Sequence, residues 1–159
     1  MNRAKYNRYF KFAVVRNPWD RLYSTFRYAE RDVQRYKSSP LEWITHFPDF
    51  ESFVMQGMTE EIASRHYFIG CQVNYLRLPS GEVDPDITIG KLEMLQEFLS
   101  SLTPLLPRLT EVGVRNASPG RQPLHEVYSV EMIIKVRQLF APDIHEFGYV
   151  FPNSEHNKL

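Results

Sequence analysis

The alternation of hydrophobic and polar positions predicts a chain with few strands and many helices. The apolar run at residues 10–15, rich in Val and Phe, is typical of a buried strand. Asn17, Pro18 and Asp20 follow it in the order of a helix cap, a first helical position and a first-turn acid. We therefore expect a helix from residue 18 to about residue 36, and an α/β fold.

Shorter elements are predicted downstream from capping residues and apolar runs. Two short strands are expected on either side of a loop at residues 79–81. A long irregular segment is expected at residues 103–123, which are rich in proline and glycine, and residues 152–159 are expected to be a flexible tail. The expected strands are 75–78 and 87–89; the expected helices are 49–56, one beginning at 59–62, 93–102 and 129–140, with a final turn at 143–147.

The composition limits the classes of function. The 159 residues, of which 43% are hydrophobic, can bury the core of one domain. The 19 basic and 19 acidic residues give zero net charge, so we expect no nucleic-acid partner. Cys71 is the only cysteine, which excludes an internal disulfide and a Cys-rich zinc site, and we expect no metal. No apolar run approaches the ~20 residues of a membrane-spanning helix.

The junction between the first strand and the first helix has the features of an anion site. A helix start offers free backbone N–H groups, and Arg16 adds a positive charge beside it. Ser24 follows Asn17 by seven residues, close to two helical turns, so both lie on one helix face. The alternative is an ordinary capped amphipathic helix in which Arg16 pairs with a carboxylate.

The run RNPWDRLYS, residues 16–24, closely resembles the RNPxDRLxS signature of the carbohydrate sulfotransferases, a family of Golgi glycan-modifying enzymes and bacterial relatives. In that family the Arg and the Ser hold the 3′-phosphate of 3′-phosphoadenosine 5′-phosphosulfate (PAPS), which implies these roles for Arg16 and Ser24. Asp20 and Arg21 match too, and we expect a helix-start acid and a structural ion-pair partner. Weaker similarities follow in family order at residues 66–76, 86–95, 114–118 and 128–151.

The resemblance implies a sulfotransferase-like, P-loop-type three-layer fold over residues 1–151, with a parallel sheet flanked by helices. It implies transfer of sulfate from PAPS, a nucleotide co-substrate, to a hydroxyl or amine of a glycan acceptor. Relatives fold a loop over the nucleotide near residues 115–121, so Arg115 joins Arg16, Asn17 and Ser24 as a candidate cofactor-binding residue. The catalytic residues are unassigned: His66 and His46 are candidates for a base, but a histidine beside aromatic residues is more often structural.

One family element is missing from these residues. Relatives carry a PKTGGTS-like loop that holds the 5′-phosphosulfate, whereas no glycine precedes Gly57 here. We therefore expect an N-terminally truncated domain (a fragment, a mis-started gene model or a degenerate paralogue) with little activity and an exposed sheet edge through which a homodimer forms. The chain as written is expected in the cytoplasm, and a longer parent with an anchor in the Golgi lumen or at the membrane.

Three other interpretations remain open. A non-catalytic nucleotide- or anion-binding pseudoenzyme would share the same junction and would bind adenosine 3′,5′-bisphosphate without turnover. A P-loop kinase relative would have a similar fold, but the chain contains no GxxxxGK[ST] motif. Basic and aromatic residues mix within residues 3–11, as they do in RNA-binding proteins, although the leader of an exposed strand often has this composition.

Overall fold

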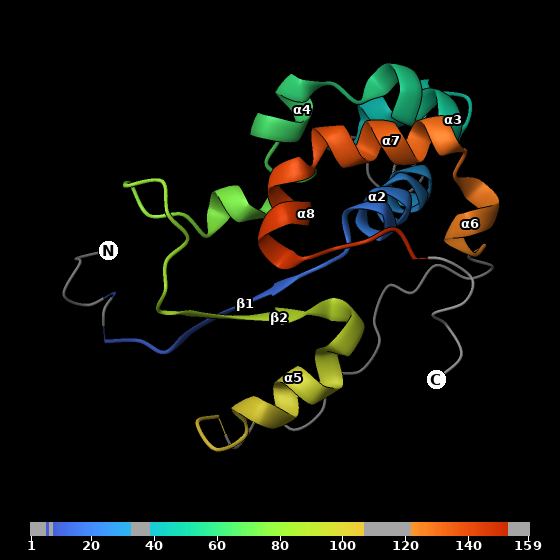
Figure 1. Ribbon diagram of the computed structural model, residues 1–159. Coiled ribbons are helices and arrows are strands. Elements are labelled where there is room, and N and C mark those ends of the chain that lie inside the picture. Colours follow the sequence, from blue (N-terminus) through green and yellow to red (C-terminus); the bar gives the residue numbers. More distant parts are fainter. Residues whose placement is uncertain (1–5, 7, 33–38, 107–121, 153–159) are drawn as a thin grey trace. The chain divides into compact units, whose positions relative to one another are not determined.

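The computed structural model describes residue 6 and residues 8–32, 39–106 and 122–152 (Figure 1). The chain divides into two compact units. Unit 1 comprises Met1–Arg16 and Gln72–Arg115, and unit 2 comprises Asn17–Cys71 and Asn116–Leu159. The predicted tail and most of the predicted irregular segment lie outside the described residues. The single domain predicted over residues 1–151 remains a prediction.

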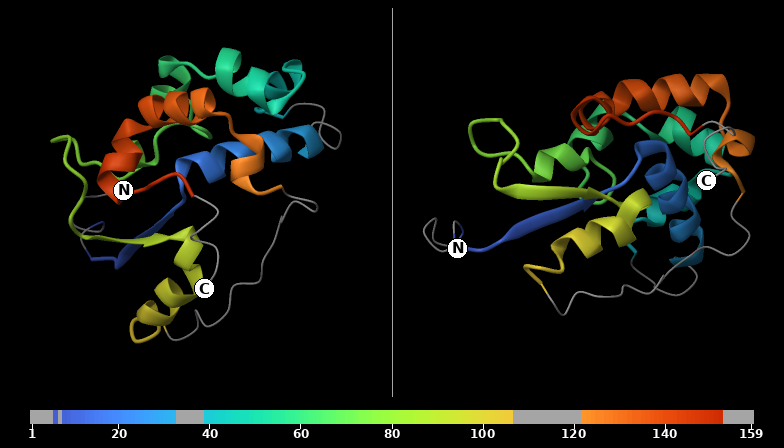
Figure 2. Two further views of the ribbon diagram at one scale, coloured as in Figure 1. Left: turned by 45° about the vertical axis from the view of Figure 1, so that its right-hand side comes forward. Right: turned by 60° about the horizontal axis from the view of Figure 1, so that its bottom comes forward.

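Unit 1 is built on a parallel pair of strands. Strand β1 (Lys11–Val15) pairs with β2 (Ile87–Lys91) in a continuous register from Lys11 opposite Ile87 to Val15 opposite Lys91. The chain then enters the short 3-10 helix η4 (Leu92–Met94) and helix α5 (Leu95–Leu102), which lies beside β2 (Figure 2). The α/β class, the parallel pairing and the two expected strands at these positions are confirmed.

Strand β1 is less buried than its sequence predicts. Only Val15 is buried, while Phe12 and Val14 are 41% and 39% exposed. The reason is that β1 belongs to a sheet of two strands within the described residues, and the short α5 covers part of it. Phe98 of α5 packs on Gly90 and lies 6.2 Å from the ring of Phe12.

The strand predicted at residues 75–78 is wrong. Residues Gln72–Tyr75 form the 3-10 helix η3, and Arg77 makes only an isolated antiparallel bridge with Val83. A tight turn intervenes, because the N–H of Leu78 donates to the carbonyl of Glu82 and the N–H of Gly81 donates back to Leu78. Gly81 has φ of 93° there, a conformation that favours glycine.

A buried carboxylate ties the start of β1 to the turn before β2. Asp84 is 4% exposed and accepts a hydrogen bond of 2.7 Å from the hydroxyl of Tyr6. The ammonium of Lys11 lies 3.3 Å from Asp84 and 3.2 Å from Asp86. The Tyr6 hydrogen bond and the other donors hold the pKa of Asp84 below its usual value. These contacts hold the N-terminal end of β1 beside the turn that precedes β2.

Unit 2 is a helical assembly around α2 (Pro18–Asp32). The cap from Asn17 and the start at Pro18 are as predicted; residues 33–38, where the helix was expected to end, lie outside the described part. Helix α7 (Val130–Leu139) packs against α2 and the π-helix η2 (Phe53–Gly57) (Figures 1 and 2). The other elements are η1 (Glu42–His46), α3 (Phe50–Ser52), α4 (Glu60–Arg65), α6 (Leu124–Val127) and α8 (Ala141–Phe147).

Side-chain caps begin three of these helices, and those at residues 49 and 59 begin where the sequence predicts. Asp49 accepts from the N–H of Ser52, Thr59 from Ile62 and Ser129 from Met132. The expected final turn is instead the helix α8, which ends at Gly148 with φ of 62°. That left-handed conformation is the usual way for glycine to stop a helix.

Aromatic side chains fill the interior of unit 2. Trp19, Phe53 and Phe140 are at most 1% exposed. The hydroxyl of Tyr128 donates to the carbonyl of Trp19 at 2.9 Å, and the indole N–H of Trp19 donates to Ile133 at 3.2 Å. Buried Tyr and Trp keep such polar partners because an unmade hydrogen bond is costly. These bonds fix α2 against the α6–α7 region.

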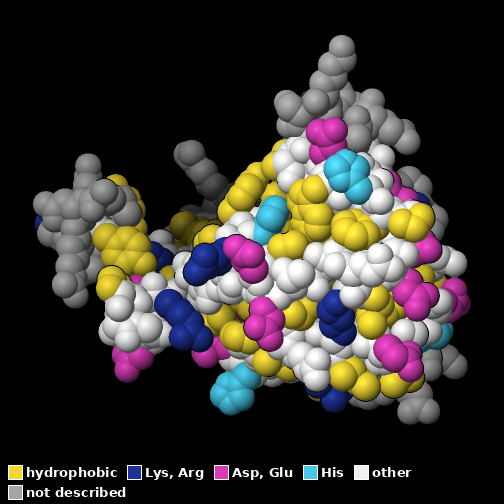
Figure 3. All heavy atoms as spheres, turned by 90° about the horizontal axis from the view of Figure 1, so that it is seen from above, with side chains coloured by type: hydrophobic (Ala, Val, Ile, Leu, Met, Phe, Trp, Pro, Cys, Tyr) yellow, Lys and Arg dark blue, Asp and Glu magenta, His cyan; other side chains and the backbone are white. Residues whose placement is uncertain are grey.

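The surface of unit 2 mixes hydrophobic side chains with charges of both signs (Figure 3). Met55 of η2 and Val130 and Ile134 of α7 are exposed, and Lys135 donates to the carbonyl of Met55 at 2.7 Å. No helix in the described part of the chain has both the length and the apolarity needed to cross a membrane.

Replacement of Gly90 by Ala should destabilise unit 1. A Cβ atom at position 90 would overlap the ring of Phe98, so that ring or the strand must move. We expect a loss of ~1–3 kcal/mol in the free energy of unfolding, the usual cost of overpacking. Urea denaturation measures it, and the double variant Gly90→Ala/Phe98→Ala should be no less stable than Phe98→Ala alone. A double variant that loses the full sum of both costs would contradict the packing.

Candidate functional site

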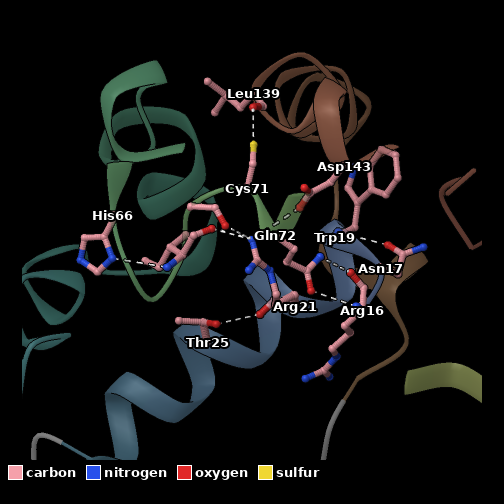
Figure 4. Close-up of polar contacts among 12 residues, drawn as sticks. Arg16, Asn17, Trp19, Arg21, Thr25, His66, Cys71, Gln72, Leu139 and Asp143 are labelled. Carbon is pink, nitrogen blue, oxygen red and sulfur yellow. Dashed lines mark hydrogen bonds and ion pairs between the residues drawn. The ribbon is translucent and has the colours of Figure 1, made fainter. Parts of the chain in front are cut away.

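The candidate site begins at Arg16, the last residue of the first segment of unit 1. Arg16 follows β1, and the side chain of Gln72 bonds to both polar groups of its backbone (Figure 4). The Arg16 N–H donates to Oε1 of Gln72 at 2.9 Å, and Nε2 of Gln72 donates to the Arg16 carbonyl at 2.8 Å. The carboxamide thus occupies the place that a neighbouring strand would take, and it holds Arg16 in an extended conformation.

The guanidinium of Arg16 is partly buried and lies in the field of a carboxylate. Burial lowers the pKa of Arg16, and the charge of Glu93 raises it. Arginine keeps its proton under such conditions because its ordinary pKa is above about 12. Arg16 is therefore a permanent positive charge that has lost part of its hydration, which suits it to binding an anion.

Asn17 opens unit 2 as the cap of α2. Its Oδ1 accepts from the N–H of Trp19 at 3.1 Å, and its Nδ2 donates to the carbonyl of Val150 at 2.8 Å. The carbonyl of Asn17 accepts from the N–H of Arg21 at 2.8 Å, the first bond of the helix. Both ends of the carboxamide thus bond within unit 2, so Asn17 shapes the start of α2.

Ser24 lies on α2, is partly buried, and shares the helix face of Asn17, as its spacing predicts. Its neighbour Thr25 is buried and donates to the carbonyl of Arg21. Arg16 belongs to unit 1 and Ser24 to unit 2, so a shared phosphate site remains a prediction. Arg115, the fourth predicted ligand, lies outside the described residues.

Arg21 is the structural ion-pair partner that the sequence indicates. Its Nη2 donates to the carbonyls of Ile69 and Gly70 at 2.6 and 2.7 Å, and lies 3.9 Å from the carboxylate of Asp143, which is fully buried. The guanidinium also lies over the ring of Phe140. These partners fix the loop after α4 to α2 and α8 (Figure 4).

His66 has a structural role within unit 2. Its Nδ1 accepts from the N–H groups of Phe68 and Ile69 at 3.2 and 3.3 Å, and its ring stacks on Tyr67. Burial lowers the pKa of His66. An Nδ1 atom that accepts hydrogen bonds carries no proton, so this ring is neutral. Among the described residues, no cluster of three His, Cys, Asp or Glu side chains is arranged to hold a metal.

Sequence reasoning missed the part played by Gln72. The family similarity at residues 66–76 includes Gln72 but implies no role for it. A glutamine that bonds a backbone 56 residues away leaves no local pattern in the sequence. The interaction becomes visible only when η3 and the end of β1 are placed together.

Residues 1–150 of the chain match the model of the group described as the Sulfotransferase family. No curated protein and no solved structure matches the chain.

The neutral ring of His66 should make unfolding sensitive to acid. The unfolded chain protonates this histidine near its ordinary pKa of about 6.5, whereas the folded chain resists protonation until a lower pH. Between the ordinary pKa and the lower pKa of the folded chain, the unfolded state therefore binds more protons. The stability contributed by neutral His66 is lost as the pH falls through this range.

His66→Asn keeps an acceptor for the two N–H groups and removes the titration. We expect wild type to lose more stability than His66→Asn between pH 7 and pH 5 in chemical denaturation. His46→Asn, at an exposed histidine, is the control and should follow wild type. Parallel curves for wild type and His66→Asn would show that His66 does not titrate as described.

Proposed function

The chain belongs to the sulfotransferase family, and we propose that it transfers sulfate from PAPS to a hydroxyl or amine of a carbohydrate. The observation that supports this function is the junction at Arg16. An extended arginine, clamped through its backbone, stands immediately before a capped helix start, within a segment that resembles the family's phosphate-binding signature.

We propose that Arg16 and Ser24 bind the 3′-phosphate of the nucleotide. Arg16 would supply a charge-assisted hydrogen bond, and Ser24 a hydroxyl on the face of α2 that Asn17 caps. Asn17 would contribute by fixing the first turn of that helix, since its side chain bonds to Trp19 and Val150. Arg115 is proposed as a further ligand on the resemblance alone.

The proposed reaction breaks one bond to sulfur and forms another. The acceptor oxygen or nitrogen attacks sulfur, and adenosine 3′,5′-bisphosphate leaves with the electrons of its S–O bond. The acceptor's proton passes to a base. Arg16 and Ser24 would hold the far end of the nucleotide and so align the sulfuryl group, because positioning of reactants is a large part of such catalysis.

The finer features of the fold and setting belong to the same proposal. A P-loop-type three-layer architecture is compatible with the parallel β1–β2 pair and the helices. The carbohydrate acceptor and a Golgi setting are supported by the resemblance of residues 16–24 to Golgi glycan sulfotransferases.

A second function is compatible with the same junction. A protein that binds adenosine 3′,5′-bisphosphate through Arg16 without transferring sulfate would use the same clamped arginine. A transfer assay with radiolabelled PAPS and a panel of glycans separates the two functions, since only the enzyme yields labelled glycan.

Arg16→Ala should remove the preference for a 3′-phosphate. We expect wild type to bind adenosine 3′,5′-bisphosphate more tightly than adenosine 5′-phosphate in calorimetry. A hydrogen bond to a charged group contributes roughly 1.5–3 kcal/mol, so the variant should lose about tenfold to a hundredfold of that preference. Arg77→Ala, at an exposed arginine of unit 1, is the matched control. Equal binding of both nucleotides by wild type would refute the proposed phosphate site.

Glu93→Gln should have the opposite effect. The carboxylate of Glu93 attracts the Arg16 charge and would compete with a phosphate for it. Removing an exposed charge of this kind changes binding by about 0.2–1 kcal/mol, so we expect adenosine 3′,5′-bisphosphate to bind up to about fivefold more tightly, and most clearly at low salt. Glu97→Gln on α5 is the control. Weaker binding to Glu93→Gln would contradict the competition.

A further inference from the structure

We propose that Gln72 is a positioning residue that sets the direction of the Arg16 side chain and thereby the selectivity for a 3′-phosphorylated nucleotide. The inference rests on the proposed function of Arg16 and goes beyond it, because Gln72 needs no contact with the ligand. Its carboxamide bonds to the protein backbone, through the hydrogen bonds of 2.9 and 2.8 Å to the N–H and the carbonyl of Arg16.

Arg16 lies where regular structure offers no such bonds. The ladder of β1 ends with Val15 opposite Lys91, and α2 begins at Pro18. Asn17, the residue between Arg16 and Pro18, is the cap of that helix. The backbone of Arg16 therefore passes between two elements, and both of its polar groups need partners.

A carboxamide is suited to this place because of its chemistry. It presents an acceptor and a donor side by side in one plane, as a peptide group of an adjacent strand does. The two bonds can form together only if the N–H and carbonyl of Arg16 point to the same side, as they do in extended backbone. Gln72 thus restrains φ and ψ of Arg16 at once.

The restraint matters because arginine is long. A backbone rotation of 10–20° moves a group about 6 Å away by roughly 1–2 Å, beyond the ~0.5 Å tolerance of a well-built site. Loss of the clamp should therefore misplace the guanidinium while the remaining nucleotide contacts persist. The expected signature is reduced discrimination between nucleotides with little change in the affinity for adenosine 5′-phosphate.

The test measures both nucleotides by calorimetry on the full 159-residue chain. We expect Gln72→Ala to reduce the preference for adenosine 3′,5′-bisphosphate by about three- to tenfold, as is common within one hydrogen-bond network. The double variant Arg16→Ala/Gln72→Ala should show the same preference as Arg16→Ala, since Gln72 acts through Arg16. Gln96→Ala, at an exposed glutamine of α5, should behave as wild type.

A second variant applies even if Gln72→Ala does not fold. In Gln72→Glu the ionised carboxylate keeps the acceptor but repels the Arg16 carbonyl, whereas the protonated acid again offers a donor and an acceptor. The ordinary pKa of Glu is about 4.3. We therefore expect the preference of Gln72→Glu to be low at pH 7.5 and to approach that of wild type at pH 4, compared with wild type at each pH.

The outcomes separate the two ideas. No preference in wild type, or a preference unchanged in Arg16→Ala, would overturn the proposed phosphate site and this inference with it. A preference lost in Arg16→Ala but kept in Gln72→Ala, or equal weakening of both nucleotides by Gln72→Ala, would overturn the inference alone. A Gln72→Glu preference that shows no change with pH relative to wild type would overturn it too.

Discussion

The backbone of Arg16 needs two hydrogen bonds that neither β1 nor α2 supplies, and the carboxamide of Gln72 provides both. This constraint decides where the strand may stop and the helix may start. Without it, the extended segment would have to be paired by a further strand or left to water. The side chain of Gln72 makes both bonds without a further strand, and it restrains the backbone of the residue that follows β1.

Arg16 and Gln72 are the two positions at which the chain leaves unit 1 and returns to it. Unit 1 is interrupted after Arg16 and resumes at Gln72, and these two residues are hydrogen-bonded to each other. Within unit 2, Asn17 and Arg21 hold the first turns of α2 through Val150, Ile69 and Gly70. Several residues of the RNPWDRLYS run are thus occupied in packing and capping.

Much of the fold could be predicted from local patterns. The start of α2, three capped helices and both strands of the parallel pair follow from periodicity, caps and punctuation by glycine and proline. The errors arise where tertiary contacts decide. The exposure of Phe12 depends on how much of β1 is covered by α5. Residues 75–78 are divided between the end of η3 and the single bridge from Arg77 to Val83. The Gln72 clamp links distant residues and has no local signal.

The two arginines of the signature show how one side-chain type is given two tasks. Arg21 is bonded to carbonyls and faces the fully buried Asp143, so its charge is compensated by a group that solvent does not reach. The carboxylate whose charge acts on Arg16 is that of Glu93, which is exposed and can turn to water when an anion arrives. Displacing Asp143 would leave a buried charge, at a cost of several kcal/mol, whereas displacing Glu93 costs little. Under the proposed function, the phosphate binds Arg16 at lower cost than Arg21, although the two arginines are only five residues apart.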